Sequence, residues 1–233
     1  MISGTFRAEA LTHVTIVVLT FPQIPTVICS HSSKYPKESV SRFLDLFVAA
    51  IGLIVLLPLA LVVAAVVKFS EGGPVLFKAL RVGKGGKVFN IYKFRTMIPN
   101  ANREGGGITT AQDSRVTTMG RFLRHWKIDE LPQLINVIKG EMSLVGPRPE
   151  DPRYVAGYND QQRSLLSIRP GITSPASLAY RNEAELLSGE DWERRYLKEI
   201  LPHKLALELE YQRTRSLRSD LSLIVRTLGG ILK

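Results

Sequence analysis

An uninterrupted apolar run from Leu46 to Val67 constrains this chain more than any other feature of its sequence. The run has twenty-two residues and no charged side chain. As a helix with a rise of ~1.5 Å per residue it would be about 33 Å long, enough for a hydrocarbon core of ~30 Å. The alternative is a fully buried helix of a soluble protein, which rarely runs so far without a polar residue. The run therefore predicts a membrane element.

This element divides the chain into three parts. Residues 1–40 form an N-terminal extension of unknown role, residues 41–70 the membrane helix, and residues 71–233 a domain of ordinary size. The apolar residues of the extension are interrupted by Pro22 and Pro25 and begin too late for a clean signal peptide.

Pro58 lies at the centre of the apolar run, where it removes one backbone donor and bends a helix. A simple span should carry more basic residues on its cytoplasmic side, but here both flanks are basic. The basic residues are Lys34, Lys37 and Arg42 before the run, and Lys68, Lys78, Arg81 and Lys84 after it. A re-entrant helix that breaks at Pro58 and returns to the same face would explain both features. An ordinary Pro-kinked span is the alternative, and these physical arguments do not separate the two.

The charge balance of the chain favours a phosphate-bearing partner. Lys and Arg number 31 against 21 Asp and Glu, which gives a formal charge of +10. Nucleic acid, anionic lipid headgroups and phosphorylated substrates all fit that charge. Cys29 is the only cysteine, so no internal disulfide can form, and the histidines show no spacing typical of a zinc site.

The polar part of the chain shows both strand and helix patterns. Residues 74–81 and 87–97 predict a hairpin around the glycine-rich turn at 83–86, and residues 100–114 predict a polar loop. Residues 121–127 predict a short basic helix. Apolar residues spaced as on one helix face predict a second helix over 129–139, with Asp129 as its N-cap and Gly140 ending it.

The C-terminal third predicts amphipathic helices. Its last segment carries an apolar stripe flanked by arginines, and such a helix can pack on the core or lie on a membrane surface. Packing on the core is the more usual outcome. The stripe consists of Leu217, Leu221, Ile224, Val225 and Leu228, beside Arg215, Arg218 and Arg226.

Asp129 and Glu130 are the candidate chemical groups. A helix start and the nearby cations Arg121, Arg124 and Lys127 favour an ionised carboxylate. Such a carboxylate can attack a phosphate or hold Mg²⁺ that bridges phosphate oxygens. The competing interpretation is an ordinary cap followed by a first-turn glutamate, and caps greatly outnumber catalytic pairs.

Three further cations suit phosphate binding. Arg148 lies between two prolines on a stiff backbone, which favours a bidentate phosphate contact, although a surface arginine in a turn is the alternative. Lys93 and Arg95 are two residues apart on a predicted strand and therefore share a face. They could clamp a diphosphate or form a solvated strand edge.

Four motifs in a fixed order resemble one known family. With the hydrophobic element at 43–69, they are similar to the bacterial sugar transferases, the monotopic phosphoglycosyltransferases, over roughly residues 40–185. The motifs are F-N-I-Y-K-F-R-T-M at Phe89–Met97, K-I-D-E-L-P-Q-L-I-N-V-I-K-G at Lys127–Gly140, M-S-L-V-G-P-R-P at Met142–Pro149 and R-P-G-I-T at Arg169–Thr173.

The resemblance implies an α/β fold class. It implies a re-entrant membrane helix joined to a small mixed α/β catalytic domain at the membrane face, with both helix ends in the cytosol and amphipathic C-terminal helices. The location would be the inner (cytoplasmic) membrane. The implied activity is transfer of a sugar 1-phosphate from a UDP-sugar to polyprenyl (undecaprenyl) phosphate, which initiates surface glycan assembly. Membrane lipid is thus an expected partner, nucleic acid is not, and a homodimer is left open.

The resemblance also implies roles for individual residues. Asp129 would be the nucleophile on the β-phosphate, and Glu130 beside it would help to hold Mg²⁺. Arg124 would lie near the phosphates and Arg148 would bind the nucleotide sugar. Lys93 and Arg95 fall in the K-F-R motif of the family.

Two positions depart from the family pattern. Leu57 stands before the kinking proline where the family often has serine, and Ser174 follows Ile-Thr where glycine is common. The chain resembles the minimal form of the family, without the four-span region of larger members. One rival hypothesis is a membrane-anchored basic module that binds anionic lipid or nucleic acid without catalysis, although basic residues are not interleaved with aromatics as nucleic-acid readers usually show. Another is a sugar transferase that acts directly on a glycan acceptor without a covalent intermediate.

Overall fold

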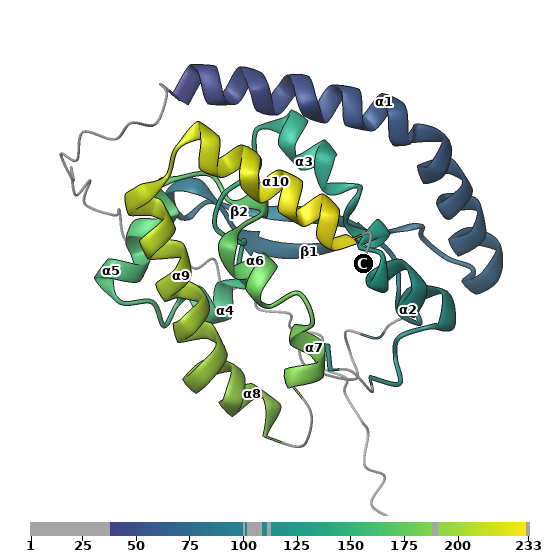
Figure 1. The fold of residues 1–233 in the computed structure, drawn as a ribbon. Helices are drawn as coiled ribbons and strands as arrows, with labels where there is room; N and C mark the ends of the chain where they lie inside the picture. The colour runs from purple at the N-terminus through teal and green to yellow at the C-terminus, as the bar shows by residue number, and fades with distance from the viewer. Residues whose placement is uncertain (1–37, 100, 102–108, 111–112, 188–190, 232–233) are drawn as a thin grey trace, which may run out of the picture.

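A computed structural model describes residues 38–99, 101, 109–110, 113–187 and 191–231 of the chain. Residues 1–37 of the predicted N-terminal extension and most of the predicted loop at 100–114 lie outside the described residues, whereas residues 38–40 belong to the first helix. The described part contains one long helix and a mixed domain of helices and short strands (Figure 1). This architecture agrees with the predicted α/β class.

The apolar run forms most of α1 (Glu38–Glu71). Its segment Ser41–Ser70 is long and apolar enough to cross a membrane, and only 11% of its most hydropathic window is buried by the rest of the protein. Helical structure continues through Pro58, so the predicted interruption of the helix is not present as a gap. Figure 1 shows α1 curving around the domain, which fits a proline that removes one backbone hydrogen bond without ending the helix.

The hairpin predicted after α1 is confirmed. Strands β1 (Leu76–Val82) and β2 (Val88–Phe94) pair antiparallel, with Leu76 opposite Phe94 and Val82 opposite Val88. The turn η1 (Lys84–Gly86) requires glycine, because Gly85 and Gly86 both have positive φ. Phe89 and Ile91 point from alternate positions of β2 into the core.

Short elements build the rest of the domain around a second, parallel strand pair. Strands β3 (Ser143–Val145) and β4 (Gly171–Thr173) pair in register, so residues 146–170 form the connection between them. The remaining elements are α2 (Thr118–His125), η3 (Ile128–Glu130), α3 (Gln133–Lys139), α4 (Pro152–Val155), α5 (Asp160–Arg163), η4 (Ser164–Ser167), α6 (Pro175–Ala179), α7 (Glu183–Leu186), α8 (Trp192–Arg195), the π-helical η5 (Tyr196–Ile200), α9 (Leu201–Thr214) and α10 (Leu217–Ile231).

Both halves of α1 pack on the domain. Ala49, in the first half, is fully buried in a cluster with β2 and α3, and Val67, in the second half, is fully buried in a cluster with Phe94 and Leu123. Polar contacts reinforce the first half, where Asp45 accepts hydrogen bonds from the Ser143 hydroxyl (2.7 Å) and the Leu144 amide (3.1 Å). The opposite face of α1 is exposed along its length.

The C-terminal helix α10 packs on the domain differently from the expectation. It packs on the domain through Leu223, which is buried. The apolar stripe that was expected to pack is instead largely exposed, because most of it lies on the opposite side of the helix from Leu223. Its exposed members are Leu217, Leu221, Val225 and Leu228.

Candidate active site

The segment that carries Asp129 begins with an unusual backbone. Lys127 has φ 54°, and no other non-glycine residue in the described chain has a positive φ. The segment continues as the 3₁₀ turn η3, so the predicted role of Asp129 as N-cap of a helix over 129–139 is wrong. Helix α3 begins only at Gln133, after Pro132. The proline has no N–H to donate to the Ile128 carbonyl, and the Leu131 amide bonds to that carbonyl three residues back, so the segment runs as a 3₁₀ turn before α3.

Asp129 is almost completely enclosed. Its relative exposure is 5%, and its Oδ1 atom is buried without a hydrogen-bond partner in the part of the chain that the structure describes. Unpaired buried carboxylate oxygens are costly, and proteins retain them mainly where a ligand or reaction uses them. Asp129 therefore does not use this oxygen to cap a helix, and the oxygen remains available to a ligand.

Glu130 joins two cations from distant segments. The Lys93 ammonium, on β2, donates to Oε1 of Glu130 at 2.7 Å. The Arg148 guanidinium, from the proline-rich turn after β3, donates to the same oxygen at 2.8 Å. These two contacts bring Lys93 of the K-F-R motif, Glu130 of the D-E dipeptide and Arg148 of the P-R-P motif into one cluster.

The two adjacent carboxyls have opposite protonation preferences. Burial raises the pKa of Asp129 above its usual value, although Lys93 opposes this effect. Burial alone would also raise the pKa of Glu130, but Arg148 and Lys93 outweigh it and hold that pKa well below its usual range. Arg124 and Lys127 do lower the pKa of Asp129, as the sequence suggested, but burial outweighs them. At Glu130 the lowering comes from Arg148 and Lys93, which the sequence had not placed beside it.

Arg124 and Lys127 complete the basic surroundings of Asp129. Arg124 donates from Nε to the Thr96 hydroxyl at 2.8 Å. Burial lowers the pKa of Arg124, and Asp129 is the acidic group that opposes this shift most. Lys127 donates to the carbonyl of Arg181 at 3.4 Å. Burial lowers the pKa of Lys127, and Glu130 opposes that shift. The sequence named Lys127 only as a nearby cation; its positive φ could not be inferred from helical periodicity.

Arg95 does not join the cluster around Glu130. Strand β2 ends at Phe94, and the Arg95 side chain donates to the carbonyl of Gly72 in the turn that follows α1. Its backbone amide also bonds to Val75 in the same region, at 2.9 Å. The structure thus brings together Lys93, Arg148 and Glu130 but directs Arg95 toward the end of the membrane helix.

The family profile described as "Bacterial sugar transferase" matches residues 36–233. The chain belongs to the bacterial sugar transferase family. This confirms the resemblance that the four motifs indicated, and the match includes both the long helix and the complete cluster around Asp129.

Curated bacterial sugar transferases and related enzymes match the chain with substantial identity. The UDP-glucose:undecaprenyl-phosphate glucose-1-phosphate transferase of Caulobacter vibrioides is 36% identical over 82% of this chain and 69% of its own length. A putative undecaprenyl-phosphate N-acetylgalactosaminyl 1-phosphate transferase of Bacillus subtilis is 42% identical over 53% of this chain and 69% of its own. An N-acetylgalactosaminephosphotransferase of Aeromonas hydrophila is 39% identical over 63% of this chain, which covers 35% of the length of that relative.

The carboxylates of this sugar transferase fit the predicted Mg²⁺ by their chemistry. In the described residues no group of three or more His, Cys, Asp or Glu side chains could hold a metal by itself. Mg²⁺ is, however, commonly bound by one or two carboxylates together with substrate phosphates and water. Asp129 offers a buried oxygen without a partner, and Glu130 lies next to it in the chain. The two residues are therefore suitable ligands, and their binding of the ion stays a prediction.

Proposed function

We propose that this chain transfers a sugar 1-phosphate from a UDP-sugar to undecaprenyl phosphate, with Asp129 as the nucleophile. The observation that carries the proposal is the enclosed carboxylate of Asp129, with one unpaired oxygen, beside a carboxylate that two cations neutralise. The names of the relatives supply the substrate class: several are undecaprenyl-phosphate sugar phosphotransferases that act on glucose or N-acetylgalactosamine. A relative from Sinorhizobium fredii is named an exopolysaccharide production protein, which supports a role in surface glycan assembly.

The proposed reaction proceeds in two displacements at one phosphorus. In the first, a carboxylate oxygen of Asp129 attacks the β-phosphorus of the UDP-sugar. The bond from that phosphorus to the bridging oxygen breaks, and UMP leaves with the electron pair. In the second, an oxygen of undecaprenyl phosphate attacks the same phosphorus, which releases the Asp129 carboxylate and forms the lipid diphosphate sugar.

The surroundings of Asp129 suit this chemistry. A carboxylate whose pKa is raised by burial is a stronger nucleophile when ionised than one in water. Arg124 and Lys127 oppose the negative charge that accumulates when an anion attacks an anion, and Glu130 fixes Lys93 and Arg148 in position for the diphosphate. Mg²⁺, held by Asp129 and Glu130, would supply further neutralisation of the diphosphate.

We also propose that α1 is re-entrant, with the domain on the cytosolic face of the inner membrane. The first half of α1 is tied to the domain through Asp45 and through Arg42, whose guanidinium donates to the carbonyl of Val137 at 2.6 Å. Its second half packs on the same domain through Val63 and Val67. A straight span would carry one end of the helix away from the domain by about 30 Å. Contacts at both ends, with an exposed apolar outer face between them, support entry and return on one side.

The experiment that tests the nucleophile separates covalent from direct transfer. Purified protein is mixed with a UDP-sugar that carries radioactive β-phosphate, without lipid acceptor, and is quenched and run on a gel. The wild-type chain should become labelled and release UMP to about one turnover, because the first displacement needs no lipid. Asp129→Asn keeps the shape of the side chain but cannot attack, so it should lose both the label and turnover.

Asp160→Asn is the matched control, since Asp160 is exposed at the start of α5. It should label like the wild type. Equal labelling of the wild type and Asp129→Asn would exclude Asp129 as the nucleophile. A wild-type protein that turns over with lipid but never carries label would instead support direct transfer.

A further inference from the structure

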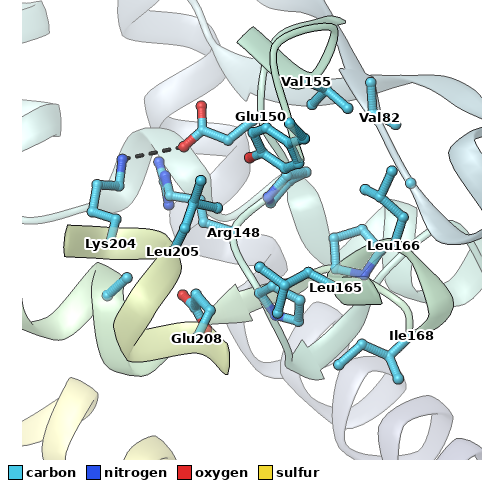
Figure 2. Close-up of a pocket in the computed structure, with 16 residues that line it drawn as sticks. Val82, Arg148, Glu150, Val155, Leu165, Leu166, Ile168, Lys204, Leu205 and Glu208 are labelled. Carbon is cyan, nitrogen blue, oxygen red and sulfur yellow. Dashed lines mark hydrogen bonds and ion pairs between the residues drawn. The ribbon is translucent and has the colours of Figure 1, made fainter. Parts of the chain in front are cut away.

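A small pocket lies behind the turn that carries Arg148. Its volume is ≈ 30 Å³, and it is lined by this proline-rich turn on one side and by helix α9 on another (Figure 2). On the helix side it is lined by Lys204, Leu205 and Glu208, which lie on one face of α9. None of these α9 residues was singled out from the sequence, because they lie about sixty residues beyond the motif.

Glu208 is the unusual residue of this cavity. It is only 5% exposed, and its Oε1 atom has no hydrogen-bond partner within the described residues. The Ser174 hydroxyl and the backbone amides of Ala176 and Arg148 lie against the carboxyl group and favour its charged form. Ser174 is also one of the two positions at which the sequence departs from the family pattern.

The backbone and side chain of Arg148 face opposite ways. Its amide lies toward Glu208, whereas its guanidinium reaches Glu130 at 2.8 Å in the candidate active site. The next ionic contact along the cavity is between Lys204 and Glu150, at 3.2 Å (Figure 2). Lys204 also pairs with Glu183 at 3.0 Å, so its charge is already shared between two carboxylates. The groups that bond to Glu208 are therefore the Ser174 hydroxyl and the backbone amides of Ala176 and Arg148.

We propose that Glu208 is a positioning residue: its carboxyl group holds the backbone of the Pro147–Pro149 turn against α9, so that the Arg148 guanidinium is preset for the nucleotide sugar. This inference rests on the proposed function, because it assigns Glu208 to the binding of that substrate. A preset guanidinium loses less rotational freedom on binding, so loss of the support weakens substrate binding more than it slows the chemical step.

The protonation of Glu208 gives the proposal a second readout. Burial raises the pKa of Glu208 to about 7, against the opposing effects of Ser174, the two backbone amides and Lys204. The other titratable or charged groups that line the cavity are Arg148, Glu150, Tyr158 and Lys204. Glu208 therefore ionises near neutral pH, and a buried charge with one unpaired oxygen favours opening of the contact with the turn.

The test compares Glu208→Gln, which resembles the neutral acid, with Glu208→Met, which keeps the length but cannot bond to the turn. Leu205→Val is the matched control, since Leu205 lines the same cavity from α9 but offers no polar atom. UDP-glucose and UDP-N-acetylgalactosamine serve as probes, because their diphosphates do not titrate near neutral pH. KM and kcat for UMP release and the midpoint of thermal unfolding are measured for each protein in detergent.

We expect Glu208→Met to raise KM about tenfold, because about one hydrogen bond to buried donors is lost. Its kcat should stay within about twofold of the wild-type value. Glu208→Gln should keep the KM of the wild type at acidic pH. The wild-type KM should rise as pH passes through neutrality, while that of Glu208→Gln stays flat. Leu205→Val should lower the unfolding midpoint without changing KM.

Several results would overturn the inference while leaving the proposed function intact. They are an unchanged KM in Glu208→Met, an equal rise of KM in Leu205→Val, and identical pH dependence in the wild type and Glu208→Gln. If Glu208→Met does not fold, the dependence of KM on pH in the wild type and in Glu208→Gln is the test of the inference. Failure of the wild type to release UMP from any UDP-sugar would count against the proposed function instead.

Discussion

Asp129 and Glu130 are neighbours in the chain, yet their surroundings give them different chemical properties. Glu130 is neutralised through one oxygen by Lys93 and Arg148, which keeps it ionised. Among the described residues Asp129 has no such direct partner at Oδ1, and burial raises its pKa. Two carboxyls whose environments separate their pKa values are typical of sites in which one group reacts and the other organises.

Glu130→Gln should separate binding from reaction. The neutral amide leaves Lys93 and Arg148 free to bind the diphosphate but no longer holds them in a fixed arrangement, so we expect near-normal nucleotide-sugar affinity and about a hundredfold lower turnover. Equilibrium binding of the UDP-sugar and steady-state UMP release measure the two effects. Glu185→Gln, at an exposed position on α7, is the control and should change neither. Loss of affinity in parallel with turnover would contradict this division of roles.

Glu208 should make the stability of the protein depend on pH. Its pKa is raised from 4.5 to about 7 in the folded state, so the folded protein prefers the neutral acid. The stability from this preference is fully present below the unfolded-state pKa and is lost as pH rises through about 7. The difference in unfolding free energy between Glu208→Gln and the wild type should therefore grow in favour of the variant as pH rises from acidic to mildly alkaline, by at most about 3 kcal/mol. Unfolding midpoints of both proteins across that range check this, and a constant difference would contradict it.

At the scale of elements, α1 is held to the domain at both ends. Asp45 and Arg42 bind the region around α3 and β3 near the helix start, and Val67 is buried against β2 and α2 near its end. Pro58 lies between these anchors, on an exposed part of a helix that curves around the domain (Figure 1). The exposed apolar face thus occupies the outside of the curve, where lipid would lie.

Cysteine labelling should test the topology of α1 directly. In a chain without Cys29, single cysteines near residues 38 and 72 should both be shielded from an impermeant thiol reagent in intact cells, and both should react after the cells are opened. Ser70 is preferable to Gly72 for the second site, because Gly72 has a positive φ that disfavours a side chain. Labelling near residue 38 from outside would mean that the helix spans. Pro58→Leu should remove the bend and shift some molecules toward a spanning arrangement.

At the scale of the whole molecule, the exposed apolar surface and the basic site lie on different elements. The outer face of α1 and the stripe leucines of α10 are exposed and apolar, and both helices contact β3. The cluster around Asp129 is basic, in a chain of formal charge +10. The basic cluster suits the phosphates of both proposed substrates, the lipid phosphate and the nucleotide diphosphate.

Transfer by the complete enzyme should depend on a hard divalent cation. Two adjacent carboxylates without soft ligands suit Mg²⁺, which keeps several waters and binds phosphate oxygens. We expect EDTA to abolish UMP release, Mg²⁺ to restore it, and Zn²⁺ to substitute poorly. A chelated enzyme that retains full activity would refute the metal role of Glu130.

The sequence by itself determined the features that depend on neighbours along the chain. The length of the apolar run predicted a membrane helix, the glycines at 83–86 and alternating residues predicted the hairpin, and Gly140 marked the end of α3. Residue types and spacing also indicated the family. These signals are local, because helix and strand periods and turn conformations act over a few residues.

Only the tertiary structure decided which candidate groups meet. It joined Lys93 and Arg148 on one oxygen of Glu130 and directed Arg95 to Gly72, although Lys93 and Arg95 are two residues apart. It also reversed the expected protonation preference of Asp129 and placed Glu208 behind Arg148. The physical reason is that desolvation and charge pairing depend on atoms contributed by distant segments, and no local pattern in the chain records which segments those are.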